Sequence, residues 1–211
     1  MATPTFNGRL LIASPHLTDG NFFRSVVLMV QHDDEGGFGL LLNRPTDRRL
    51  RGVLVDAKDD AAWRDDDLIY CGGPVEGPLL AIHTIAGIGR PCGGSGDAAN
   101  VEISDSPAHA FGEMSFSFDP APIWVTSDED HLRILARRHD APVRYVAAYS
   151  GWGPKQLEYE FEQGGWLVGD ADPDLVFGDS EELWESVVKR CGHEILGSVD
   201  PKMKFGDPNL N

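Results

Sequence analysis

The sequence predicts an α+β fold with a mixed β-sheet, built as one domain over residues 1–211. Two observations lead to this fold class. Short apolar segments typical of strands alternate irregularly with amphipathic segments typical of helices, which argues against a regularly wound parallel sheet. Two of the apolar segments are also separated by a tight turn, so at least one pair of strands is antiparallel.

The antiparallel pair is expected at residues 26–31 and 38–43, after a first short strand at residues 10–13. Residues 33–37, Asp-Asp-Glu-Gly-Gly, provide turn chemistry with two glycines that adopt positive φ without strain. Both strands of the pair are almost continuously apolar. Because a strand with one wet face alternates apolar and polar residues, this pattern predicts that the hairpin lies centrally in the sheet.

The rest of the chain continues the mixture of strands and helices. Further strands are predicted at residues 68–71, 79–85, 123–126, 143–149 and 166–168, and helices at residues 50–57, 127–139, from 154 onward, and 180–191. The helical segments are bounded by residues that typically begin or end a helix. Ser127 is expected to cap the second helix, Pro154 to begin the third and Gly192 to end the last.

Two stretches depart from this alternation. Residues 86–120 contain Gly-Gly-Ser-Gly, many small residues and short strand-like runs, and are predicted to form an inserted loop or hairpin within the single domain. Residues 197–211 contain two prolines and no periodicity, which predicts an irregular tail.

The charge balance restricts the kinds of partner. The chain has 34 acidic and 18 basic side chains, a formal net charge of −16. Such a surface repels the phosphates of nucleic acids and anionic lipids, which bind through Lys and Arg. Eight arginines form two sequence clusters, Arg44, Arg48, Arg49 and Arg51, and Arg133, Arg137, Arg138 and Arg144. Aspartates and glutamates interleave with them, so local ion pairs are expected rather than a nucleic-acid surface.

The cysteines and the apolar segments indicate a cytoplasmic protein. Cys71, Cys92 and Cys191 are odd in number, far apart and not arranged as CxxC, so neither a disulfide framework nor a cysteine zinc site is expected. Residues 1–8 lack the features of a signal peptide. The apolar run at residues 26–30 is far shorter than the roughly 20 residues that span a bilayer.

Three blocks occur in order along the chain: LLIASPHLTDGNFFRSVVLMVQHDDEGGFGLLLNRPT, CGGPVEGPLLAIH and YSGWGPKQLEYEFEQGGWL. In order and spacing they resemble the YqgE/AlgH family of bacterial proteins, over about residues 9 to 197. The resemblance lies in Pro15, Asp19, Phe22, Ser25, Val26, His32, Gly39, Asn43-Arg44-Pro45, Gly72-Gly73-Pro74-Val75, Gly151-Trp152, Gln156-Leu157-Glu158 and Trp166.

The resemblance implies a single α+β domain with a mixed, bifurcated sheet, partly closed like a barrel and flanked by helices. It implies no established reaction. The family's label as transcriptional regulators, which comes from a link to alginate production, implies a regulatory role. Residues 86–120 are longer than the usual pattern of the family, so the resemblance assigns no role to that stretch.

The turn from Ser150 to Lys155 is one candidate ligand site. It leads from a strand into a helix, whose N-terminus offers unpaired N–H groups and partial positive charge. Gly151 and Gly153 would let a ligand approach the backbone, and Lys155 adds a positive charge. The turn therefore predicts a small-anion site that includes Trp152. The alternative is a tight structural turn in which Trp152 anchors the packing.

Asn43 and Arg44, at the end of the hairpin, are the other candidate ligand-binding residues. His32 lies at the opposite end of that hairpin beside two aspartates, and we expect it to cap the turn rather than to act as a base or metal ligand. His16 and His83 lack a second histidine at helical spacing. No catalytic residue, metal or cofactor is therefore expected.

The function favoured by the sequence is a non-enzymatic binding or regulatory protein whose partner is another protein or a small anionic ligand. The main alternative is a hydrolase or phosphate-handling enzyme built on the Ser150–Lys155 turn, with His32 or Asn43 contributed from elsewhere. The turn is neither a P-loop nor a nucleophile elbow. A weaker alternative is a DNA-binding regulator, although no helix-turn-helix or zinc-finger pattern occurs.

Overall fold

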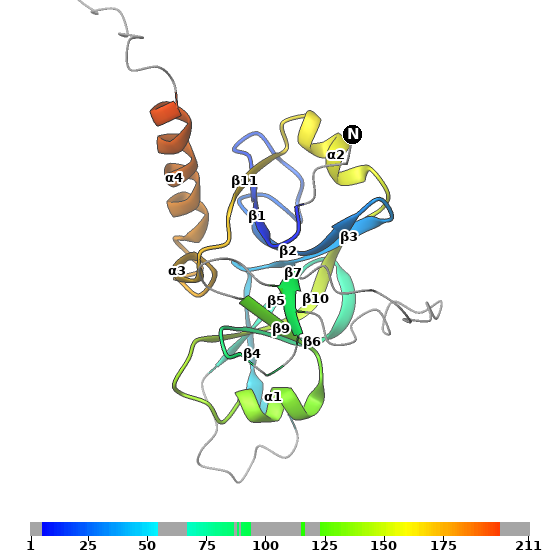
Figure 1. Ribbon diagram of the computed structural model, residues 1–211, viewed down its shortest axis with the longest axis vertical. Helices are drawn as coiled ribbons and strands as arrows, with labels where there is room; N and C mark the ends of the chain where they lie inside the picture. Colours follow the sequence, from blue (N-terminus) through cyan, green and yellow to red (C-terminus); the bar gives the residue numbers. More distant parts are fainter. Residues whose placement is uncertain are drawn as a thin grey trace, which may run out of the picture.

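The computed structural model describes residues 6–54, 67–86, 88, 90–93, 115–116 and 123–198. In this part of the chain the strands form one branched sheet with helices at its periphery (Figure 1). The strands are β1 (Arg9–Ala13), β2 (Val26–Asp33), β3 (Gly36–Leu41), β4 (Pro45–Arg49), β5 (Leu68–Cys71), β6 (Val75–His83), β7 (Arg90–Gly93), β8 (Ser115–Phe116), β9 (Ile123–Thr126), β10 (Val143–Trp152) and β11 (Trp166–Asp170). The helices are η1 (Leu50–Gly52), α1 (Glu129–Leu135), α2 (Gln156–Glu162), α3 (Pro173–Val176) and α4 (Leu183–Ser198).

The strand order confirms the predicted mixed and bifurcated α+β sheet. The order is β11-β1-β2-β3-β10-β6-β9-β7-β8, with β5 beside β10 and β4 beside β5. The β10–β5 and β7–β8 pairs are parallel and the other pairs are antiparallel. The β2–β3 hairpin lies between β1 and β10, so its predicted central position is confirmed. In the described part of the chain the sheet is not closed into a complete barrel.

The sheet branches along β10, its longest strand. The first half of β10 pairs with β5 on one side and β6 on the other, whereas Ser150–Trp152 pair with β3. The register shifts between Ala147 and Tyr149, and Ala148 between them has a φ of 67°. An extra residue at this point bends the strand and redirects it toward a new neighbour. One strand thereby belongs to both halves of the sheet.

The Gly-Gly-Pro sequence after β5 fits this bend. A side chain at Gly72 would lie 2.3 Å from the carbonyl oxygen of Ala148, and one at Gly73 would lie 2.3 Å from the carbonyl of Tyr149. Gly73 also has a φ of 155°. The Gly72 N–H donates to Ala147 O at 2.7 Å, and the Ser150 hydroxyl donates to Gly72 O at 3.0 Å. The two glycines therefore allow the backbone after β5 to lie close to the branch point of β10.

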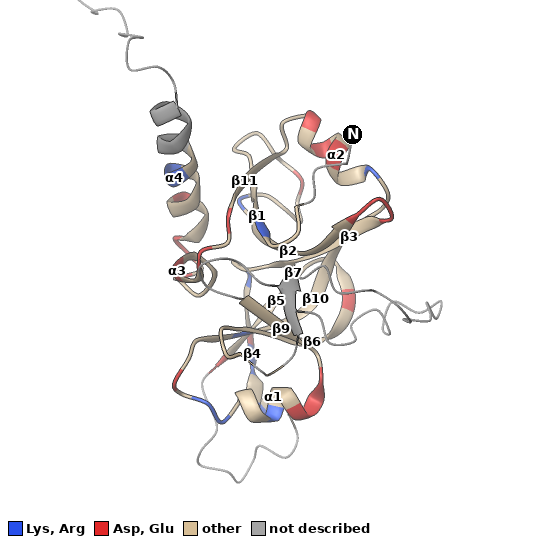
Figure 2. Ribbon diagram, in the orientation of Figure 1, with Lys and Arg blue, Asp and Glu red and all other residues tan. Residues whose placement is uncertain are grey.

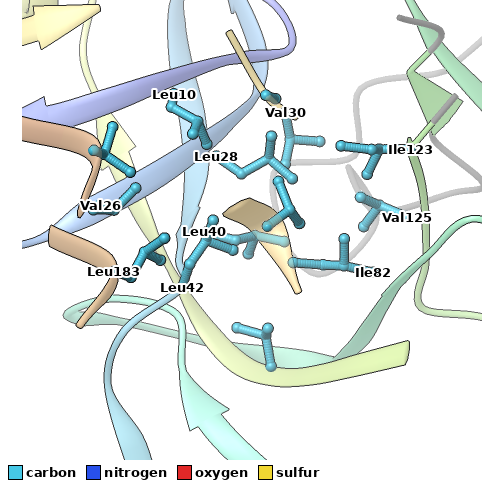
Figure 3. Packing of buried hydrophobic residues seen from close by; sticks show 14 of the residues in the cluster. Leu10, Val26, Leu28, Val30, Leu40, Leu42, Ile82, Ile123, Val125 and Leu183 are labelled. Atoms are coloured by element: carbon cyan, nitrogen blue, oxygen red, sulfur yellow. The ribbon is translucent and has the colours of Figure 1, made fainter. Parts of the chain in front are cut away.

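The largest hydrophobic cluster joins both halves of the sheet (Figure 3). Its fully buried members include Leu28 and Leu40 from the central hairpin and Ile82 from β6, with Val187 of α4 packed against them. Burial of a leucine or isoleucine side chain contributes about 1.5–3 kcal/mol. The continuous apolar runs recognised in the sequence are therefore strands covered on both faces.

Three predicted helix boundaries are wrong. Helix α1 is capped by Asp128, whose carboxylate accepts the His131 N–H at 2.9 Å, and not by Ser127. Helix α2 begins at Gln156 and not at Pro154, because Lys155 before it is left-handed with a φ of 59°. Helix α4 continues through Gly192 to Ser198, since one glycine costs a helix only about 1 kcal/mol.

Other boundaries shift by a few residues. The hairpin turn is Asp34–Glu35, and Gly36 and Gly37 belong to β3. The predicted helix at residues 50–57 begins as the short 3₁₀ helix η1, and residues 55–57 lie outside the described residues. Two short strands, β7 and β8, occur within residues 86–120, and both pair with β9. Most of this predicted insertion, and residues 199–211 of the predicted tail, also lie outside the described residues.

Candidate functional site

A groove opens beside the first half of β10, where β4, β5 and the segment before α4 meet. It consists of two adjoining cavities of about 720 and 320 Å³, which share Ser180 and Glu181 in their walls. We call these two cavities the arginine groove. The larger is lined by Pro45, Asp67, Leu68, Tyr70, Pro142, Val143, Arg144, Phe177, Gly178, Asp179, Ser180 and Glu181, and the smaller by Phe23, Arg24, Asn43, Arg44, Ser180, Glu181, Trp184 and Glu185.

Arg144 is a charged group of the larger cavity that is almost completely buried. Only 5% of its surface is exposed. Its guanidinium donates to Leu42 O and, at 2.6 Å, to Gly178 O, and it lies 4.5 Å from the centre of the Tyr70 ring. Burial lowers the pKa of Arg144, and the nearby Tyr70 and Asp179 oppose this change. Among the described residues, carbonyl oxygens and an aromatic ring face this charge in place of an ion pair.

Arg44 and Asn43 lie at the smaller cavity. The Asn43 amide holds the loop before β2, because it accepts the Val26 N–H at 3.0 Å and donates to Arg24 O at 2.8 Å. The Arg44 guanidinium donates to Asn43 O at 3.1 Å and also to Phe23 O. Burial lowers the pKa of Arg44. Asn43 is therefore a positioning residue, and Arg44 is the partly buried cation at this end of the groove.

Arg24, the third arginine of the groove, lines the smaller cavity in a strained conformation. Its φ is 50°, in the left-handed region that is costly for a residue with a side chain. Its guanidinium carbon lies 5.0 Å from the Trp184 ring and 5.6 Å from the ring of Phe23, which is 50% exposed. Strained residues of this kind gather at binding sites more often than elsewhere.

The structure separates the six predicted ligand-binding residues. Asn43 and Arg44 lie at the arginine groove, whereas Gly151 and Trp152 end β10 at its far end and Gly153 and Lys155 follow it. The sequence did not identify three other residues of the groove, which are Arg144, Tyr70 and Asp179. Arg144 did belong to a noted arginine cluster, but its partners come from segments 34 to 102 residues away.

The Ser150–Lys155 turn uses several of its polar groups within the fold. The Gly153 N–H donates to the side-chain oxygen of Gln156 at 3.1 Å, and the buried Ser150 hydroxyl is bonded to Gly72 O. Helix α2 has only seven residues. Figure 2 shows acidic residues on α2 and on the neighbouring β2–β3 turn. Anion binding by this turn stays a prediction.

Trp152 anchors a closed cluster of aromatic rings, as the structural alternative predicted. One carboxylate oxygen of Glu160 accepts the indole N–H of Trp152 at 3.0 Å and that of Trp166 at 2.9 Å. The other oxygen accepts from Gln156 at 2.9 Å. The Phe22 ring stacks on Trp152 at 5.8 Å. The role of Glu160 was not predicted, although its spacing from two tryptophans was visible in the sequence.

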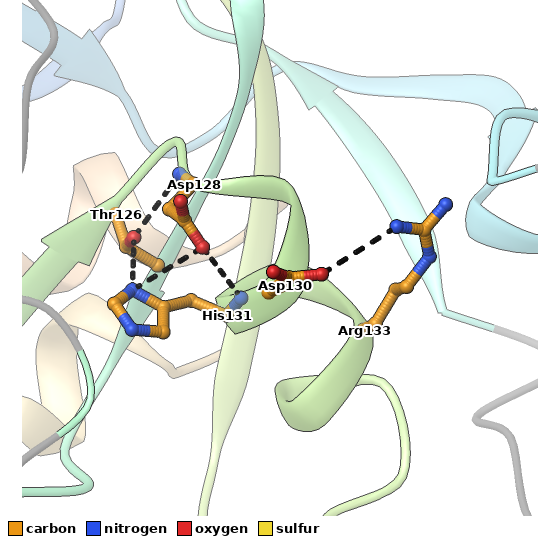
Figure 4. Close-up of polar contacts among 5 residues, drawn as sticks. All are labelled: Thr126, Asp128, Asp130, His131 and Arg133. Atoms are coloured by element: carbon orange, nitrogen blue, oxygen red, sulfur yellow. Dashed lines mark hydrogen bonds and ion pairs between the residues drawn. The ribbon is translucent and has the colours of Figure 1, made fainter.

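The histidines form hydrogen bonds within the fold. His32 is buried, accepts the Phe6 N–H at 3.4 Å through Nδ1 and places Nε2 3.5 Å from Glu158, so it does not cap its own turn as predicted. His83 is fully buried, and this burial lowers its pKa from 6.5 to about 4. His131 contacts Thr126 and Asp128 at the start of α1 (Figure 4). Within the described ranges no three His, Cys, Asp or Glu side chains are arranged to hold a metal.

Arginines of the second sequence cluster pair locally, as expected. Arg133 lies 2.6 Å from Glu129 and 3.7 Å from Asp130, and the second of these contacts is drawn in Figure 4. Arg138 donates to both oxygens of Asp140 at 2.7 and 2.5 Å.

Among the described residues no helix is long and apolar enough to cross a membrane.

The branched sheet and the three sequence blocks define a member of a recognised class of bacterial proteins. The family model described as AlgH-like matches residues 10–196, and the chain belongs to this AlgH-like family. The resemblance seen in the sequence is thereby confirmed.

Relatives of nearly equal length support this assignment. A UPF0301 protein of Streptomyces coelicolor is 35% identical over 98% of this chain and 96% of its own length. A UPF0301 protein of Chlorobium limicola is 30% identical over 89% of this chain and 87% of its own. The solution structure of the AlgH protein from Pseudomonas aeruginosa matches with a TM-score of 0.61 and 26% identity, covering 94% of this chain and 96% of that one. A crystal structure from Corynebacterium diphtheriae shares the fold, with a TM-score of 0.63, 21% identity and coverage of 90% and 89%.

Proposed function

We propose that this protein is a cytoplasmic, non-enzymatic binding protein that holds a small anionic ligand in the arginine groove. The proposal rests mainly on Arg144. A guanidinium that is 5% exposed, lines a cavity of about 720 Å³ and faces carbonyls and a ring has electrostatic attraction left for an anion. A charge-assisted hydrogen bond to such a group contributes about 1.5–3 kcal/mol.

Arg44 supports the same chemistry at the other end of the groove. Its charge is partly buried, and the Asn43 amide fixes the backbone at Arg24 and Val26 before any ligand arrives. Residues that are held in place before binding lose little conformational freedom when a ligand binds. The two arginines come from β10 and from the end of the central hairpin, which are rigid elements of the sheet.

The alternatives rank lower on the contacts of the described residues. The hydrolase hypothesis needs an available Ser150 hydroxyl beside a base, but this hydroxyl is buried and bonded to Gly72 O. Direct DNA binding needs a continuous basic surface, but Arg133 and Arg138 pair with neighbouring carboxylates. Both remain open to direct measurement.

The proposal is tested by titrating the full chain with butyrate, a simple monocarboxylate, while the backbone amide signals are followed by NMR. We expect shifts concentrated at Tyr70, Arg144 and Ser180. Arg44→Gln should weaken butyrate binding about tenfold. Arg48→Gln is the control, because Arg48 is exposed on β4 and is not among the groove residues. Absence of shifts in the groove, or shifts confined to the Ser150–Lys155 turn, would overturn the proposal.

A further inference from the structure

We infer that the ligand is dipolar: its carboxylate or other acidic group binds at Arg144, and a cationic group on the same molecule faces Asp179 and Glu181. This inference rests on the proposed anion-binding role of the groove and adds the chemical class of ligand. It follows from the difference in burial between the basic and the acidic side chains that line the larger cavity.

The positive charge lies on the floor and the negative charges lie on the rim. Arg144 is buried, whereas Asp179 and Glu181 are both exposed and line the same cavity. Asp67 is also part of the lining. A ligand that reaches the arginine therefore lies in a cavity whose exposed wall carries carboxylates.

This arrangement discriminates between ligands by charge. A dianion is attracted by Arg144 but repelled by the rim, and a simple cation meets the buried guanidinium at the end of its path. A ligand with both charges forms one ion pair with the buried Arg144 and another with the exposed carboxylates. Phe177 also lines the cavity, and an aromatic ring there favours a cationic group nearby.

The spacing between the two signs of charge is fixed by the chain itself. Arg144 donates to Gly178 O at 2.6 Å, immediately before Asp179 in the sequence. The Asp179 carboxylate in turn accepts the Glu181 N–H at 2.7 Å. The buried arginine thus holds the segment that carries the rim carboxylates. A site prepared in this way selects for the distance between the acidic and the cationic group of its ligand.

The experiment compares three probes of matched length by calorimetry and amide NMR on the full chain. Each linear ω-amino acid, from β-alanine through γ-aminobutyrate to its longer homologues, is measured beside the monocarboxylate and the dicarboxylate of the same carbon chain. At the preferred length we expect the ω-amino acid to bind about tenfold more tightly than the dicarboxylate. The monocarboxylate should fall between them.

Substitutions at the rim should then weaken the preference. The double variant Asp179→Asn, Glu181→Gln keeps an oxygen that accepts the residue-181 N–H, and both positions are exposed, so it should fold normally. It should bind dicarboxylates more tightly and ω-amino acids more weakly, reducing the difference at least about fivefold. Glu182→Gln is the matched control, because Glu182 is exposed beside the groove but does not line it.

The outcomes separate this inference from the proposed function. If no probe of any length perturbs the groove, the proposed function itself fails. If carboxylates bind but ω-amino acids show no advantage at any length, or if the rim variant leaves the ratio unchanged, the groove binds anions and the dipolar ligand is excluded.

Discussion

The two ends of β10 use charged side chains in opposite ways. At the far end, the Glu160 carboxylate accepts two indole N–H groups and a glutamine amide, which completes a closed cluster. At the near end, the guanidinium of Arg144 is more deeply buried and also bonded within the fold, but it lines a cavity. Both ends adjoin motifs that looked functional in the sequence. The comparison indicates that burial alone does not make a charged side chain a candidate for ligand binding. The side chain must also line a cavity.

The largest effect is expected at the closed end. Glu160→Ala removes the shared acceptor of Trp152 and Trp166 and leaves both indole N–H groups without it. We expect the free energy of unfolding to fall by about 3 kcal/mol, measured by urea denaturation with circular dichroism. Glu162→Ala, exposed on the same helix, should change it by less than about 0.5 kcal/mol. Equal losses in the two variants would contradict the structural role of Glu160.

The next effect concerns His83, which pairs with Val143 in the register of the near end. Burial lowers the pKa of folded His83 from 6.5 to about 4, so the unfolded chain takes up this proton first as the pH falls. The resulting stability is complete above the unfolded pKa and is lost as the pH falls from 6.5 to about 4. The loss at about pH 4.5 should be about 2.5 kcal/mol.

Urea denaturation across this pH range measures the contribution of His83. The His83→Asn variant should lose less stability between neutral pH and about pH 4.5 than the wild type does. His16→Asn is the control for the same substitution at an exposed histidine. A wild-type pH dependence in the His83 variant would show that another group is responsible.

The third effect tests how the near end is built. Arg144→Lys keeps the charge but cannot bond Leu42 O and Gly178 O together with the two ends of a guanidinium, which in Arg144 also lies 4.5 Å from the centre of the Tyr70 ring. We expect a loss of about 2 kcal/mol in the free energy of unfolding and at least tenfold weaker butyrate binding, roughly as for any broken bidentate contact. Arg137→Lys, exposed after α1, is the control for both measurements. If stability falls but butyrate affinity does not, Arg144 is structural only.

The smallest effect lies at Lys155, at the far end. Its φ of 59° strains any residue with a Cβ atom, so Lys155→Gly should raise the free energy of unfolding by about 0.5 kcal/mol. Lys155→Ala removes the same charge and keeps the strained backbone, and should leave stability nearly unchanged. The same pair of variants, titrated with phosphate, tests the predicted anion site of Gly151, Trp152, Gly153 and Lys155. Equal stability of the two variants would refute the strain.

Local patterns in the sequence predicted much of the fold. The apolar runs of the hairpin place it centrally because continuous burial leaves no other position. The acidic residues interleaved with the second arginine cluster predicted local ion pairs, and Arg133 forms one with Glu129. The helix ends were less predictable, since Gly192 can remain helical and Asp128 competes with Ser127 as a cap. These choices depend on differences of about 1 kcal/mol, which local sequence does not resolve.

The candidate site could be predicted only in part. Asn43 and Arg44 stand out because they end a clear strand in a recognisable motif. Arg144 meets the backbone at Leu42 only through folding, over a separation of 102 residues. Its counterpart Asp179 lies in the segment before α4, where the sequence shows turn residues and no motif. Contacts between distant segments of this kind need the strand order, which no single pattern in the chain specifies.

The branching of β10 has a consequence for how the molecule opens. Tyr145–Ala147 pair with β5 and β6 while Ser150–Trp152 pair with β3, so both halves of the sheet share one continuous strand and the hydrophobic cluster that joins them. We therefore expect the amides on both sides of Ala148 to open together, with hydrogen exchange that reports the global unfolding equilibrium. Local fraying is left to the peripheral strands and helices, which hold no part of this shared ladder.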